Sequence, residues 1–229
     1  MDSAVATIHS RGLVFPEDRR ILSPKHRRLL RRNLYEAKET RAALRTIRAD
    51  DRVLELGAGI GYMSALIMKH RGPAAYTAYE ANPRLIEYIA AVHAANAIEG
   101  VTVHNAVLGA GEGEETFYLR SNFLASSLSP GPSGEAEGVI GTARVRRRAL
   151  AGALAEAAAT ALICDIEGGE ADLLPGADLS GLRLAIIELH PQITGTAGMR
   201  AVFEACLGAG LCYHPRASHA KVVTFLRDL

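Results

Sequence analysis

The sequence contains no tryptophan, and aromatic residues make up only 5% of its 229 positions. Rows of aromatic side chains are the stacking surfaces of proteins that bind single-stranded nucleic acid, so this composition argues against that class. Lys plus Arg (26) and Asp plus Glu (25) give a net charge of +1, too little to attract RNA or anionic membranes. No apolar run reaches the roughly 18 residues of a membrane span, and the start does not resemble a signal peptide.

Cysteine is scarce as well, with Cys164, Cys206 and Cys212 and no CxxC spacing among them. An odd number of scattered cysteines argues against a disulfide framework and against a zinc site. The pattern predicts a reducing compartment, and we expect the protein in the cytoplasm. The remaining composition, 48% apolar and 22% charged, is typical of one globular domain of this length.

The charge is uneven along the chain: the first 50 residues have 12 Lys or Arg against 6 Asp or Glu, and the remainder has 14 against 19. Leu30, Leu34, Leu44 and Ile47 recur at helical spacing, which predicts a helix from Pro24 to Arg48. We therefore expect residues 1–49 to be a helical segment packed on a core domain of residues 50–229. The basic run at 25–32 is either a solvated helix face or a dock for an anionic substrate or RNA.

From residue 50 onward, short apolar strands alternate with helices, a pattern that predicts βαβ units and a parallel sheet. The expected strands are 52–56, 75–80, 101–105, 161–165 and 182–190, followed by a pair near 213 and 221–226. An insertion at 111–150 interrupts this rhythm with two strands, 116–120 and 143–147. The Ser/Gly/Pro-rich segment 121–141 between them is expected to be a lid over a substrate, or else a disordered connection.

The strongest motif is the glycine-rich turn that follows the first of these strands and includes Gly57, Ala58, Gly59 and Gly61. Glycines let the backbone approach a ligand closely, and the helix that follows offers unpaired N–H groups. Tyr62 stands one position after the third glycine, so the G-x-G-x-x-G dinucleotide fingerprint fails.

A carboxylate lies on each side of this turn in the expected fold. Glu55, just before the turn, would repel a pyrophosphate but suits a cation, so S-adenosylmethionine fits better than NAD. Glu80 ends the second strand, where an acid accepts hydrogen bonds from two ribose hydroxyls. Asn105 ends the third strand and is expected at the adenine edge, or else caps a turn. The neighbours Ala81 and Ala106 are included in the predicted cofactor site.

These residues resemble class I S-adenosylmethionine-dependent methyltransferases, and the match extends to the FkbM-type family. It is carried by Tyr35-Glu36 with residues 51–61, by residues 105–109 with 117–118 and 125–127, and by Cys164-Asp-Ile-Glu-Gly-Gly-Glu170, which is similar to a D-x-E-G-x-E signature. Glu55 and Gly59 stand where the family often has Asp and Asn.

The resemblance covers about residues 33–227. It implies an α/β, Rossmann-like class I methyltransferase fold, with a mostly parallel seven-stranded sheet, helices on both faces and a β-hairpin/loop insertion. It also implies S-adenosylmethionine as cofactor, S-adenosylhomocysteine as product, and O-methylation of a hydroxyl on a small molecule, sugar or natural product. Glu36 and Tyr62 join the predicted cofactor site on the same ground.

The candidate catalytic residues are Asp165, Glu188 and His190, because strand ends of a parallel sheet meet at one edge. Asp165 ends an apolar strand and is expected to face the acceptor or the sulfonium. His190 is a candidate base because its ordinary pKa is near neutral, or else a structural histidine. Glu170 either faces the same site or offsets the helix dipole.

No metal site is predicted, because the spacing of Asp165, Glu167, Glu188 and His190 is not diagnostic, although such oxygen donors suit Mg²⁺.

A nucleic-acid methyltransferase is an alternative, with phosphate contacts from Arg27, Arg28, Arg31, Arg32 and the arginines of 144–148. No separate RNA-binding module and no N-P-P-[YF] run supports it. A second alternative is a noncatalytic module that dimerises through its N-terminal helix. The partner we expect is a small hydroxylated acceptor, without a membrane, and a homodimer stays open.

Overall fold

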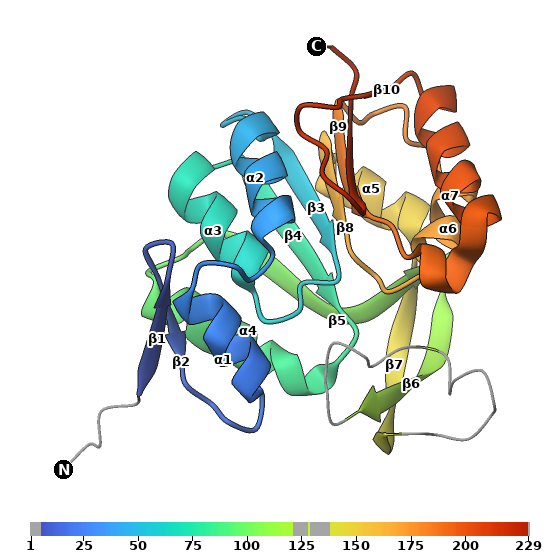
Figure 1. The fold of residues 1–229 in the computed structure, drawn as a ribbon. Helices are drawn as coiled ribbons and strands as arrows, with labels where there is room; N and C mark the ends of the chain where they lie inside the picture. The colour runs from blue at the N-terminus through green and yellow to red at the C-terminus, as the bar shows by residue number, and fades with distance from the viewer. Residues whose placement is uncertain (1–5, 121–127, 129–137, 229) are drawn as a thin grey trace.

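The computed structural model describes residues 6–120, 128 and 138–228. Nine strands form one twisted sheet with helices on both faces (Figure 1). Their order across the sheet is β10-β11-β9-β8-β3-β4-β5-β7-β6. The strands are β3 (Arg52–Leu56), β4 (Ala75–Glu80), β5 (Val101–Gly109), β6 (Gly113–Arg120), β7 (Val139–Ala149), β8 (Ala161–Cys164), β9 (Leu184–Glu188), β10 (Cys212–Tyr213) and β11 (Val222–Leu226). The predicted Rossmann-like α/β architecture is thus confirmed, with the mostly parallel pairing that the sequence indicates.

The seven-stranded count is wrong, and the insertion explains the difference. β5 runs four residues beyond Asn105, and its last residues, Ala106–Gly109, pair in parallel with β7. β7 pairs in turn with β6 in an antiparallel hairpin. The insertion hairpin therefore extends the edge of the main sheet.

The central strands are apolar almost throughout because helices cover both of their faces. In β8, Ala161 and Ile163 face one core cluster and Leu162 and Cys164 face the other. Glu55 is the exception, a buried acid in the middle strand β3. One face carries α2 (Ala37–Thr46), α3 (Tyr62–Arg71) and α4 (Pro83–Ala95); the other carries α5 (Leu150–Ala157), α6 (Glu170–Leu173), the short 3₁₀ turn η2 (Leu174–Gly176) and α7 (Pro191–Gly208).

The sequence predicts a helical N-terminal segment, but the structure shows that this segment begins with a hairpin. β1 (Thr7–Ser10) and β2 (Leu13–Pro16) form a two-stranded antiparallel sheet. The single helix predicted over 24–48 is split into α1 (Pro24–Arg31) and α2, because Asn33 and Glu36 adopt left-handed backbone conformations. Asn33 accepts a hydrogen bond from the Arg11 backbone N–H at 2.7 Å, which ties the break to the hairpin.

The hairpin packs on the main core. Ile8, Leu13 and Phe15 are buried in the same cluster as the residues of α3. Phe15 stacks on Tyr62 with 5.6 Å between ring centroids. In the part of the chain that the structure describes, no helix has the length and apolar character needed to cross a bilayer.

Candidate functional site

The strand order reverses between β3 and β8, and the glycine-rich turn lies at that point. Gly57, Gly59 and Gly61 all have positive φ angles. A Cβ on Gly57 would lie 1.8 Å from the carbonyl oxygen of Asp165, so the turn packs directly against the segment after β8. A Cβ on Gly59 would meet only the Tyr35 hydroxyl, at 4.0 Å. Gly57 thus serves close packing, while Gly59 faces open space.

Glu80, at the end of β4, holds the turn in place. Its carboxylate accepts hydrogen bonds of 2.7 Å from the backbone N–H of Gly59 and of 2.7 Å from that of Asn82. Burial raises the pKa of Glu80 to about 7, and these N–H donors act in the opposite direction. The backbone amide of the turn and the acid predicted to meet the ribose are therefore one connected unit.

Asn105 was predicted to end its strand, but β5 continues to Gly109. Its side-chain amide donates to the carbonyl oxygens of Glu80 at 2.8 Å and of Ala81 at 3.1 Å. Asn105 thus fixes the backbone around Glu80, and its contact with adenine stays a prediction. Ala106 is buried beside it and Ala81 is half-buried.

Tyr62 and Ala58, also predicted for the cofactor site, are buried in the core. The Tyr62 ring packs against Phe15 and, edge-on at 5.2 Å, against Tyr35. Tyr35 is not among the predicted site residues. It is 3% exposed, so its hydroxyl lies in the buried interior beside the turn. The only sequence signal for it is the Tyr35-Glu36 pair that the resemblance includes.

Buried carboxyl groups gather around the turn. Glu55 is 2% exposed, and burial raises its pKa to about 8. Burial, with the charges of Glu39, Asp165 and Glu55, also raises the pKa of Glu36 well above its ordinary value. Among the described residues, no lysine or arginine forms an ion pair with Glu36, Glu55 or Glu80. The carboxyl groups around the glycine-rich turn therefore have no lysine or arginine among the described residues to neutralise them.

Raising the pH is expected to destabilise the protein without ligand. The folded-state pKa values of Glu55 (about 8) and Glu80 (about 7) lie above the ordinary 4.5. Their contribution to folding is complete below the unfolded pKa and is lost as the pH rises through the folded one, by at most about 1.4 kcal/mol per pH unit for each group. Urea denaturation between about pH 6 and pH 8.5 measures this loss. Glu55→Gln removes one titrating group and should flatten the slope; an unchanged slope would contradict the assignment.

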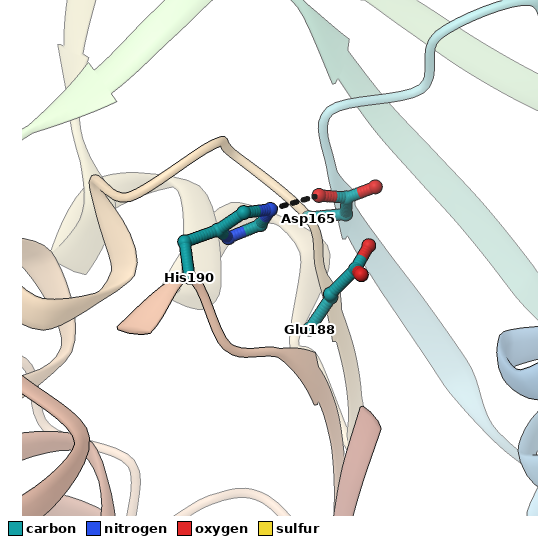
Figure 2. Close-up of side chains that lie close together, drawn as sticks. All are labelled: Asp165, Glu188 and His190. Atoms are coloured by element: carbon teal, nitrogen blue, oxygen red, sulfur yellow. Dashed lines mark ion pairs between the residues drawn. The ribbon is translucent and has the colours of Figure 1, made fainter. Parts of the chain in front are cut away.

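Asp165, Glu188 and His190 come together at the ends of β8 and β9 (Figure 2). β9 ends at Glu188, two residues earlier than predicted, and His190 stands at the start of α7. One ligand atom from each of the three residues lies within 4.8 Å of the others. His190 Nε2 is 3.6 Å from Asp165 Oδ1 and 3.4 Å from Glu167 Oε2. The three predicted catalytic side chains therefore form one cluster.

Glu170 fixes the orientation of His190. Its carboxylate, 1% exposed, accepts a hydrogen bond from the His190 backbone N–H at 2.9 Å and lies 3.2 Å from His190 Nδ1. Burial lowers the pKa of His190, but the hydrogen bond to Glu170 and the charges of Asp165 and Glu167 outweigh it and raise that pKa overall. Glu170 contacts the cluster and is also the first residue of α6, so the structure is compatible with both roles predicted for it.

The expected lid falls mostly on residues 121–127 and 129–137, outside the described residues. A hollow of about 570 Å³ in the described surface is lined by Arg45, Arg48 and Arg71 among others, and no residue of the cluster lines it.

Solved structures share this fold. TYW2 of M. jannaschii in complex with AdoMet matches with a TM-score of 0.51 at 12% identity, over 96% of this chain and 83% of that one. A Streptococcus mutans protein named as a SAM-dependent methyltransferase matches with a TM-score of 0.52 at 11% identity, over 99% of this chain and 56% of that one. A Pyrococcus horikoshii protein named as a transferase matches with a TM-score of 0.51 at 14% identity, over 97% and 70%.

At these identities the likeness shows a Rossmann-like fold of the kind found in methyltransferases, and fold alone does not fix function. No family model and no curated protein sequence matches the chain. The finer resemblance to the FkbM-type family therefore stays a prediction.

Proposed function

We propose that this protein is an S-adenosylmethionine-dependent methyltransferase that transfers a methyl group to a hydroxyl of a small molecule. The observation that carries the proposal is a set of carboxyls around the glycine turn that, among the described residues, pair with no lysine or arginine. Glu55 and Glu80 are buried, and Glu36 and Asp165 are half-buried. Burying carboxyls without partner cations is costly, and a ligand with an ammonium and a sulfonium group would offset that cost. The fold shared with methyltransferases supports the same function.

In this proposal each side of the turn meets a different part of the donor. The open space at Gly59 and the adjacent Glu80 carboxylate receive the ribose hydroxyls. Glu55 and Glu36 attract the cationic amino acid end. Asp165 belongs to both neighbourhoods: it acts electrostatically on Glu36 and faces His190 across 3.6 Å. The methyl group would thus lie between the donor-binding carboxyls and the cluster.

Methyl transfer from a sulfonium is a displacement that needs alignment and, for a hydroxyl acceptor, loss of a proton. Alignment supplies roughly 7–11 kcal/mol at its upper range, and a positioned base adds about 10²–10⁴-fold. The cluster of Asp165, Glu188 and His190 supplies the groups for the second requirement. Glu170 keeps the His190 ring in one orientation, in which Nε2 points toward Asp165 (Figure 2).

Asp165→Asn is expected to reduce methyl transfer by about 100-fold or more and to leave the fold intact. Asp165 Oδ1 has no hydrogen-bond partner, and burial, with the charges of Glu188 and Glu167, raises the Asp165 pKa. Removing this charge relieves repulsion, so stability should be unchanged or higher. Transfer of labelled methyl groups to a panel of hydroxylated metabolites, with thermal melting alongside, measures both. Full transfer activity in the variant would remove Asp165 from the mechanism.

The contacts of the arginines favour a small acceptor over nucleic acid. Arg144, Arg146 and Arg148 each form an ion pair with a glutamate, at 2.7, 3.6 and 2.5 Å. In the basic run of α1, Arg27 and Arg31 both pair with Glu17. Groups engaged in this way are less available for phosphates. A cytoplasmic location and a homodimer remain predictions from the sequence.

A further inference from the structure

The cluster at the ends of β8 and β9 has the donor set of a metal site. We propose that Asp165, Glu188 and His190 bind one divalent cation of the first transition row, such as Mn²⁺. The three donor atoms lie within 4.8 Å of one another, so one ion placed among them can contact all three. Two carboxylates and one imidazole suit Mn²⁺ and its neighbours better than the all-oxygen sites of Ca²⁺.

Two further observations point to a ligand at this place. His190 is 4% exposed, and its Nε2 is aimed at the carboxylates (Figure 2), but the distances of 3.4 and 3.6 Å are long for hydrogen bonds. Asp165 Oδ1 is a buried oxygen atom without any hydrogen-bond partner. Buried polar atoms are nearly always satisfied, so the unpartnered Asp165 oxygen, which His190 Nε2 faces at 3.6 Å, marks a position for a bound group.

The environment of His190 has the arrangement found around metal-binding histidines. Such a histidine usually donates its other ring N–H to a carboxylate, which fixes the ring and leaves the ligating nitrogen free. Glu170 is placed for this role, with Oε1 3.2 Å from Nδ1 and its carboxylate further held by the Gly168 N–H at 2.9 Å. Glu170 is thus a positioning residue for the proposed ion.

This inference rests on the proposed methyltransferase function and names how the acceptor is activated. Three protein ligands leave open positions on the ion, one of which takes the acceptor hydroxyl oxygen. The bound ion lowers the pKa of that hydroxyl, and its proton passes to Glu167, which is 42% exposed on its side chain and exchanges with solvent. The oxygen then forms a bond to the methyl carbon, the carbon–sulfur bond breaks, and its electron pair stays on sulfur. With the ion bound, His190 acts as a ligand and not as the base.

Titration of the chelator-treated full-length protein with Mn²⁺, followed by electron paramagnetic resonance, tests the site. We expect one bound Mn²⁺ per chain, loss of most binding in His190→Gln and Glu188→Gln, and about 10–100-fold weaker binding in Glu170→Gln. Glu99→Gln changes an exposed acid outside the cluster and should bind Mn²⁺ as the wild type does. Co²⁺ absorption spectra should show an imidazole ligand that His190→Gln removes.

Wild-type protein that binds no Mn²⁺, or cluster variants that bind it as well as Glu99→Gln, would overturn the site. The wild-type titration and the Glu170→Gln comparison decide the question even if one cluster variant does not fold. Calorimetry with S-adenosylmethionine in the presence of chelator separates the two proposals. Donor binding without Mn²⁺ binding defeats the metal site alone, and absence of donor binding defeats the proposed function.

Discussion

Replacement of Glu80 by alanine is expected to weaken S-adenosylmethionine binding by about 100-fold or more. A hydrogen bond to a charged group contributes about 1.5–3 kcal/mol, and the proposed contact involves two ribose hydroxyls, so the loss is at least ~3 kcal/mol, or about 10²-fold. The same substitution leaves the Gly59 and Asn82 N–H groups without their acceptor, which loosens the turn. Isothermal titration calorimetry measures the affinity.

Two variants separate the loss of ligand contacts from a general defect. Glu80→Gln keeps one acceptor oxygen and should give an intermediate affinity. Glu87→Ala removes an exposed acid from the same chain region, on α4, and should bind as the wild type does. Thermal melting of each variant shows whether the fold is retained. Wild-type affinity in a folded Glu80→Ala protein would refute the donor site at this turn.

The centre of the sheet was predictable because its residues carry a local signal. The run Ala161–Cys164 is apolar at every position, and the turn at Gly57 follows β3, a short strand that is apolar apart from Arg52 and Glu55. Parallel topology then brings strand ends together, which is why Asp165, Glu188 and His190 could be selected without knowing any contact.

The parts that the sequence did not reveal depend on contacts between distant segments. The hairpin at residues 7–16 has strands of four residues each, too short for a clear alternation. The helix break at Asn33 depends on the Arg11 backbone, 22 residues away. Glu170 was ambiguous because acids are common in the first turn of any helix, and only the structure shows its contact with His190 Nδ1.

Gly57→Ala is expected to cause the largest loss of stability among single substitutions at the turn, about 2–5 kcal/mol. A side chain in the left-handed conformation costs about 1–2 kcal/mol, and overpacking adds about 1–3 kcal/mol. The overpacking is severe here, since the new Cβ would lie 1.8 Å from the Asp165 carbonyl oxygen. That oxygen belongs to backbone anchored to β3 by the hydrogen bond from Asp165 N to Leu56 O, 2.9 Å long, so it cannot move without disturbing the β3–β8 pair.

Gly59→Ala is the matched control, because it makes the same chemical change two residues away. Its φ of 54° carries the left-handed cost, but its Cβ would meet nothing nearer than the Tyr35 hydroxyl at 4.0 Å. We expect a loss of only about 1–2 kcal/mol in urea denaturation, together with weaker donor binding, because the methyl group enters the space proposed for the ligand. Equal losses of stability in the two variants would show that Gly57 is not held against Asp165. A stable Gly59→Ala protein with full donor affinity would place the ligand elsewhere, so the pair distinguishes a glycine required for packing from one required for binding.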